Sequence, residues 1–244
     1  MFFKFTDLST ELGLLNAMFW SFNRMFDGLR VPCRIFRYYF VAQPVTSAPF
    51  LPARFGRSID IRILEPTDSA LADLPIDSDV LQYRFNQHAI CFGAFHDNTI
   101  VGCLWLCLSA YNEDEVRCCY MLNPEHSTAW DFDVYVTPAA RGGLAFLKLW
   151  DAANAYLRER NISWSLSRIS AFNPDSLRAH QNLGARRFAS AVFLQLGRLQ
   201  LMVSSLKPFV NLSVSTNQTP KLVLSASAID QPKRSAQLRP STLP

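Results

Sequence analysis

Two carboxylates followed closely by a glycine-containing turn are the residues best suited to chemistry in this chain. Asp131 and Asp133 alternate with apolar residues in a strand-like run, so we expect both carboxylates on one face of that strand. Burying two carboxylates side by side raises the pKa of one of them, which suits a general base. The structural alternative is that one carboxylate caps a loop or pairs with an arginine such as Arg117.

The turn after this strand has the composition of an anion site. Pro138 ends the strand, residues 141–143 read Arg-Gly-Gly, and a helical pattern begins directly afterwards. The first N–H groups of a helix have no partner within it, and the helix dipole favours negative charge at that end. Arg141 adds a guanidinium at the lip of the turn. The sequence therefore predicts that an anionic group such as a phosphate binds here.

A second candidate segment begins at Asn173. Asn173 and Pro174 form a typical helix start, with the Asn as N-cap, and Leu183-Gly184 ends the helix. His180 lies within it, either as a packing residue or as an acid that titrates near neutral pH. The six cysteines lack metal-ligand spacing with the four histidines, so no metal site is expected. The absence of a Gly-x-Ser-x-Gly motif argues against serine hydrolase chemistry.

Composition predicts one globular core that binds neither nucleic acid nor metal and is not inserted in a membrane. The net charge is only +4 and the arginines are scattered, which argues against a nucleic-acid patch. The sequence has no convincing signal peptide, so we expect a reducing cytoplasm. The apolar run at residues 12–22 is too interrupted to span a bilayer. We expect its helical apolar face, which includes Leu15 and Phe22, to pack on the domain; the alternative is a membrane-surface or partner helix.

The expected elements form a mixed α/β fold. Hairpins and one strand–helix–strand crossover predict a mixed, mostly antiparallel sheet with helices on both faces. We expect an N-terminal helix–strand extension over residues 1–56, a main domain over 57–205 and a tail over 206–244 that is flexible from residue 216. Strands are expected at 33–45, 59–64, 88–96, 99–108, 117–122, 130–136, 162–169, 188–196 and 198–203, and helices after 65, at 77–86, 143–160 and 173–183.

This element order, together with two motifs, resembles the GNAT N-acetyltransferase superfamily over roughly residues 59–203. Residues 134–146 look like the family's strand, Arg-Gly-rich pyrophosphate loop and helix start. In that family the loop amides hold the pyrophosphate of acetyl-CoA, and the strand pairs with the pantetheine arm. One departure is that Leu144 and Phe146 stand where small residues are usual, unless a shorter loop aligns Gly143 and Ala145 there. The resemblance assigns cofactor contacts to Val134, Val136, Arg141, Gly142, Gly143, Leu144, Ala145 and Phe146.

Residues 173–185 are similar to the family's second cofactor segment. The family's Asn contacts pantetheine, a small residue follows three positions later, and a Tyr seven positions on protonates the departing thiolate. Asn173 and Ser176 match the first two positions, and His180 replaces the Tyr. The resemblance therefore implies an imidazolium acid at His180.

The resemblance implies an acyl-CoA-dependent N-acyltransferase, most simply an N-acetyltransferase. Acetyl-CoA or another acyl-CoA is the expected cofactor, and a small-molecule or peptide amine attacks the thioester directly. Asp133 is the first choice of base and Asp131 the second. One alternative is a longer acyl chain, from CoA or a carrier protein, lined by residues 1–56; another is a non-catalytic acyl-CoA-binding or interaction module. A monomer or a homodimer is expected.

Overall fold

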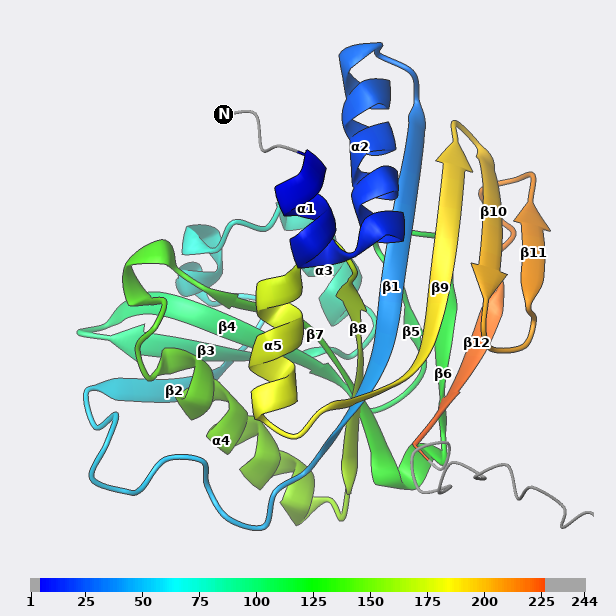
Figure 1. The fold of residues 1–244 in the computed structure, drawn as a ribbon. Coiled ribbons are helices and arrows are strands. Elements are labelled where there is room, and N and C mark those ends of the chain that lie inside the picture. The colour runs from blue at the N-terminus through cyan, green and yellow to red at the C-terminus, as the bar shows by residue number, and fades with distance from the viewer. Residues whose placement is uncertain (1–4, 227–244) are drawn as a thin grey trace, which may run out of the picture.

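The computed structural model describes residues 5–226, with only the backbone given for 5–8, and its centre is a nine-stranded sheet (Figure 1). The strands run in the order β11-β10-β9-β1-β8-β7-β4-β3-β2, and only β7 and β8 are parallel neighbours. Their bounds are β1 Cys33–Pro44, β2 Ile59–Leu64, β3 Ile90–His96, β4 Thr99–Cys107, β7 Thr128–Val136, β8 Trp164–Ser170, β9 Arg186–Leu196, β10 Leu199–Ser204 and β11 Val210–Ser213. The expected mixed, mostly antiparallel sheet is confirmed.

Helices cover both faces of this sheet, and a second small sheet covers part of one face (Figure 1). The helices are α1 Phe5–Leu12, α2 Leu14–Gly28, α3 Ser78–Phe85, α4 Ala145–Glu159 and α5 Pro174–Asn182. The small sheet has the order β12-β6-β5, with β5 Tyr111–Asn112, β6 Cys119–Asn123 and β12 Lys221–Ser225. Across the described residues, no helix is both long and apolar enough to cross a membrane.

The two faces of the large sheet have different partners, and we name them by their helices. On the α3 face, aromatic side chains such as Trp105 and Phe132 pack against α3 and the small sheet. On the α4 face, Leu104 and Leu106 pack against Leu149 and other apolar residues of α4. α5 and α2 lie on this same face, over β8 and β1 respectively. Most of the core is therefore sheet sandwiched between these layers.

Three expectations about individual elements are wrong. The segment after Glu65 forms only a 3₁₀ turn, Ser69–Asp73. The N-terminal helix is divided at Gly13 into α1 and α2. Two parts of the expected tail are strands: β11 pairs with β10, and β12 pairs in parallel with β6. The alternating Leu222 and Leu224 of β12 are buried in the core. The rest of the expected tail, residues 227–244, lies outside the described residues.

β1 occupies an interior position, although its sequence was assigned to an N-terminal extension. It pairs with β8 over Tyr38–Pro44 and with β9 over Cys33–Ala42. Its side chains are buried on both faces: Phe40 joins the α3-face core, and Val41 packs with Leu177 of α5. A strand that is apolar on both sides suits this central place.

Candidate functional site

A gap opens in the large sheet where β7 and β8 separate. The two parallel strands are paired only at Thr128–Trp130 and Trp164–Leu166. Beyond these residues, no described strand pairs with the edge of β7 that faces β8 or with the facing edge of β8. Backbone N–H and C=O groups on such edges need a partner, so the gap can receive an extended ligand.

Three cavities follow one another along this gap. The turn cavity, about 610 Å³, is lined by the 140–143 turn and the start of α4; the central cavity, about 170 Å³, lies between β7, β8 and α5. The third, about 390 Å³, opens on the α3 face, and we call it the acidic cavity. The first two cavities share Val134, Asn173, Ser176 and His180, and the last two share Phe132, Asp133 and Arg168. Together they form one cleft through the sheet.

The turn cavity is lined by the predicted cofactor residues around the N-terminus of α4, except Leu144 and the buried Ala145. Gly142 adopts φ +77°, a backbone conformation that side-chain-bearing residues rarely adopt. The Arg141 N–H donates to Thr137 and Pro138, and the Gly143 N–H donates to Ala140, so these two amides are already used within the turn. The N–H groups of Gly142 and of the first turn of α4 have no backbone partner among the described residues. The set of free amides is thus smaller than the sequence suggested.

α5 contributes the opposite wall of the cleft. The predicted N-cap is confirmed, since the Asn173 side-chain oxygen accepts the Ser176 N–H at 3.0 Å. Asn173 and Ser176 both line the turn and central cavities, where their remaining polar atoms can meet a ligand. The capping role and a binding role are therefore compatible.

His180 is buried at the junction of the turn and central cavities. Its ring makes edge contacts with Phe146 and Trp150, and the residue is only 4% exposed. Burial lowers the pKa of His180 to about 4, so its imidazole is neutral at pH 7. Its Nδ1 atom has no hydrogen-bond partner in the described part of the chain. The expected imidazolium is therefore not the form present near neutral pH.

A β-bulge sends the two candidate carboxylates to opposite faces of the sheet, so the expectation that they share a face is wrong. Trp105 lies opposite Phe132 and Cys103 opposite Tyr135, which leaves two residues of β7, Asp133 and Val134, facing one residue of β4. Asp133 itself has φ +48°. The extra residue reverses the alternation, a change that no hydrophobic pattern announces.

Asp131 points to the α4 face and lines the central cavity. One carboxylate oxygen accepts the Ser165 hydroxyl at 2.7 Å, and the other has no partner among the described residues. The residue is 1% exposed. Burial raises the pKa of Asp131 to about 7, although the hydroxyls of Ser165 and Ser167 oppose the rise. This carboxyl can both take and return a proton at neutral pH.

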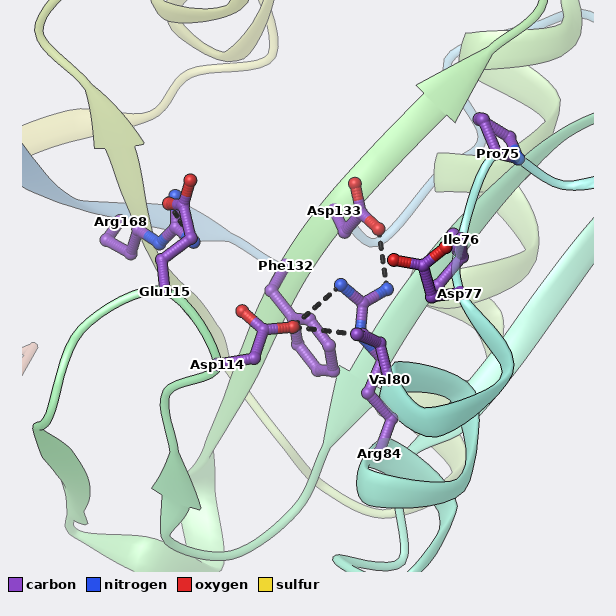
Figure 2. A pocket seen from close by; sticks show the side chains of 10 residues that line it. All are labelled: Pro75, Ile76, Asp77, Val80, Arg84, Asp114, Glu115, Phe132, Asp133 and Arg168. Atoms are coloured by element: carbon purple, nitrogen blue, oxygen red, sulfur yellow. Dashed lines mark hydrogen bonds and ion pairs between the residues drawn. The ribbon is translucent and has the colours of Figure 1, made fainter. Parts of the chain in front are cut away.

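Asp133 points to the α3 face, where Arg84 of α3 binds it (Figure 2). The Arg84 Nη1 lies 2.5 Å from the Asp133 carboxylate, and its Nε and Nη2 bind Asp114 at 3.2 and 2.9 Å. Burial opposes the charge of Arg84, but the two carboxylates outweigh it and raise its pKa. Arg117, the partner suggested from the sequence, instead donates to the Arg198 carbonyl. Arg84 is 49 positions from Asp133 along the chain, and no motif marks it.

The acidic cavity contains more carboxylates than guanidinium groups. Arg168 pairs with buried Glu113 and with Glu115, which also accepts the Tyr38 hydroxyl. Both arginines are thus held between two acids each, and Asp77 adds a further carboxylate to the lining (Figure 2). No motif in residues 111–115 marks these acids in the sequence. The arrangement favours a cationic ligand on this side of the gap.

Comparison with known proteins identifies the part of the chain that carries this cleft. The model of the acetyltransferase (GNAT) family matches residues 60–185, just over half of the sequence. No curated protein matches this chain.

Three solved structures are similar over part of their length. A GNAT-family protein from Novosphingobium aromaticivorans is 17% identical, with a TM-score of 0.45 over 66% of this chain and 65% of that chain. An acetyltransferase from Trypanosoma brucei is 18% identical, with a TM-score of 0.39 over 52% and 92%. A protein of unknown function from Staphylococcus epidermidis is 9% identical, with a TM-score of 0.47 over 71% and 66%. This chain therefore spans just under two thirds of the Novosphingobium protein.

Proposed function

Since the chain belongs to the acetyltransferase (GNAT) family, we propose that it transfers an acyl group from acyl-CoA, most simply acetyl-CoA, to an amine. The observation that carries this proposal is the continuous cleft, which starts at a helix N-terminus, follows two unpaired strand edges and ends in a cavity rich in carboxylates. Each section suits a different part of the reaction. The pyrophosphate, the thioester and the amine would occupy the turn, central and acidic cavities respectively.

The turn cavity fits the pyrophosphate and pantetheine of CoA. The free N–H groups of Gly142, Leu144, Ala145 and Phe146 stand where the helix dipole favours an anion. The unpaired edge of β7 at Val134 and Val136 would bind the amides of pantetheine, with Asn173 and Ser176 on the other side. Arg141 lines the cavity although its Nε now donates to Val136, and it can turn toward a phosphate.

We assign the base to Asp131 rather than to Asp133. Asp131 has an unpartnered oxygen and a pKa of about 7, whereas the Asp133 carboxylate is bound by Arg84. The amine nitrogen attacks the thioester carbon, the C–N bond forms and the C–S bond breaks, while Asp131 takes the amine proton directly or through a water. A carboxyl with this pKa can then return the proton to the CoA thiolate, so neutral His180 needs only to pack beside the sulfur.

The acceptor would enter from the α3 face. The acidic cavity meets the central cavity at Phe132, Asp133 and Arg168, which gives an amine a path to the thioester. Its carboxylates favour a small-molecule or peptide amine that carries positive charge. A longer acyl chain remains a variant of this proposal, and a non-catalytic acyl-CoA-binding module is its rival.

The test is release of free CoA thiol from acetyl-CoA in the presence of a panel of amines. The proposal expects turnover with at least one amine, and a loss of about 10²-fold or more in kcat in Asp131→Asn. Asp133→Asn is the control, and it should change KM for the amine more than kcat. Tight binding of acetyl-CoA without turnover of any amine would favour the module, and full activity in Asp131→Asn would refute the assignment of the base.

A further inference from the structure

Three strands at one end of the large sheet present an uncovered aliphatic surface on the α4 face. α4, α5 and α2 cover the rest of that face, but no described element lies over β9, β10 and β11 (Figure 1). The opposite side of the same strands is core: Phe193 and Met202 are fully buried there. Leu201 lies at the centre of the open side, opposite Leu194 of β9 and Leu212 of β11.

From Val192 to the end of β9, and along β10 and β11, every outward position is aliphatic. Six of these aliphatic side chains are 38% to 61% exposed, so no described element lies over them. Near the start of β9 the outward positions are polar, because Ser190 lies opposite Tyr39 and Arg187 packs over the Tyr39 ring. The aliphatic positions beyond them are contiguous, whereas the solvent-facing side of a sheet is usually polar. This sheet surface consists of Val192, Leu194, Leu196, Leu199, Leu201, Val203, Val210 and Leu212.

α2, beside this surface, has its apolar stripe on the outside. Its inner side is fixed to β1 by polar contacts: Asn16 donates to the Tyr39 hydroxyl, and Asn23 binds the backbone of Ile35. The expected packing of Leu15 and Phe22 on the domain is therefore wrong, since they are 49% and 40% exposed. An α-helix turns by about 100° per residue, and at this rotation six exposed apolar side chains of α2 fall on one side of the helix. This outer stripe is Leu14, Leu15, Met18, Phe22, Met25 and Leu29.

We propose that two copies of this chain associate face to face about a twofold axis, with each outer stripe packed on the other copy's sheet surface. Both surfaces lie on the α4 face and adjoin each other. A twofold axis therefore places the outer stripe of each copy on the sheet surface of the other, and the same contact forms twice. The partner's α2 would supply over β9–β11 the helical layer that α4, α5 and α2 supply elsewhere. The pairing is self-complementary in shape and in chemistry.

The area is sufficient for a stable dimer. From the exposed fractions, the sheet surface and the outer stripe each offer on the order of 600 Å² of apolar area. A monomer rarely exposes a patch above roughly 300–600 Å², and a standard interface buries about 800 Å² per partner. The two surfaces together exceed both values.

Other occupants suit the surface less well. Residues 227–244 contain only three large aliphatics, Ile229, Leu238 and Leu243, and the described chain reaches them from β12, which packs on the α3 face. A membrane-surface helix carries many basic residues beside its apolar face. α2 has only Arg24, and Asp27 is close to it in sequence. A second copy is therefore the occupant we choose.

Sedimentation velocity on the full chain from 1 to 100 µM tests this arrangement. We expect a dimer for the wild type, and monomers for Leu201→Asp at the centre of the sheet surface and for Phe22→Lys at the centre of the outer stripe. A one-to-one mixture of the two variants should recover dimers, because one of its two helix–sheet contacts is wild type and the other joins opposite charges. Val223→Asp on β12, where the valine is 50% exposed, is the matched control and should remain dimeric.

Circular dichroism on each variant separates loss of association from loss of fold. A wild type that stays monomeric at 100 µM overturns the proposal, and it does so in favour of a lipid surface if that monomer floats with vesicles containing anionic lipid. A dimer that survives both substitutions, or a mixture no better than either variant alone, also overturns it.

Discussion

Replacing Asp131 by Asn should make the protein more stable at alkaline pH while lowering its kcat by about 10²-fold or more. Asn has the shape of the protonated carboxyl and can still accept the Ser165 hydroxyl. In the wild type the folded-state pKa is raised from 3.8 to about 7, so the folded protein holds this proton more tightly than the unfolded chain does. The stability that this proton contributes is complete below about pH 4 and is lost as the pH rises to 7.

The magnitude follows from the pKa difference of about three units. Each unit corresponds to about 1.4 kcal/mol, so the stability of Asp131→Asn relative to wild type should grow by up to ~4 kcal/mol between pH 4 and 8 and then level off. Buried His180 has the opposite pH dependence, but it is present in both proteins and cancels in the comparison.

Urea denaturation at pH 4.5, 5.5, 6.5, 7.5 and 8.5, followed by tryptophan fluorescence, measures this difference. Asp133→Asn is the matched control: it leaves Arg84 with one carboxylate fewer and should destabilise the protein by about 1–2 kcal/mol at pH 8. A stability difference between Asp131→Asn and wild type that does not change with pH would refute the reasoning, because Asp131 would then be ionised in both states.

Three further predictions concern the other residues of the cleft. Arg84→Met leaves Asp114 and Asp133 without their guanidinium and should lower the free energy of unfolding by about 3 kcal/mol in urea denaturation at pH 8, a deficit that shrinks toward pH 4. His180→Gln should reduce kcat less than about tenfold above pH 5, because neutral imidazole is not the acid; a hundredfold loss would restore that role. The same variant should lose less stability than wild type between pH 6.5 and 4, since a buried neutral histidine contributes stability that disappears as it is protonated.

Local features of the fold and cleft were predictable from the sequence, and features that depend on distant partners were not. The Asn173 cap and the Arg-Gly-Gly turn before α4 depend only on residues that are close in sequence. The types of those residues are therefore enough to predict both features. The bulge at Asp133 is different, because one extra residue reverses the faces of β7 without changing its composition. The pairing of Asp133 with Arg84 also needs the sheet to form first.

Strands β12 and β1 show the same difference between features set by local sequence and features set by distant partners. β12 carries a readable alternation at Leu222 and Leu224, and the polar composition around it obscured the pattern. β1 was recognised as a strand, but its insertion between β8 and β9 depends on which strand edges remain free after the rest of the sheet has formed. Local pattern alone cannot supply that information.

The central claim is that the turn before α4 and the gap between β7 and β8 bind acyl-CoA, and calorimetric titration of acetyl-CoA tests it most directly. We predict one-to-one binding with a Kd between about 1 µM and 1 mM, weakened at least about tenfold in Gly142→Val, where φ +77° disfavours any side chain. Gly197→Val, which imposes a similar strain at φ +56° in the β9–β10 hairpin, should bind as wild type does. No binding at 1 mM acetyl-CoA (roughly the top of the usual range), or equal weakening by both substitutions, would contradict the account.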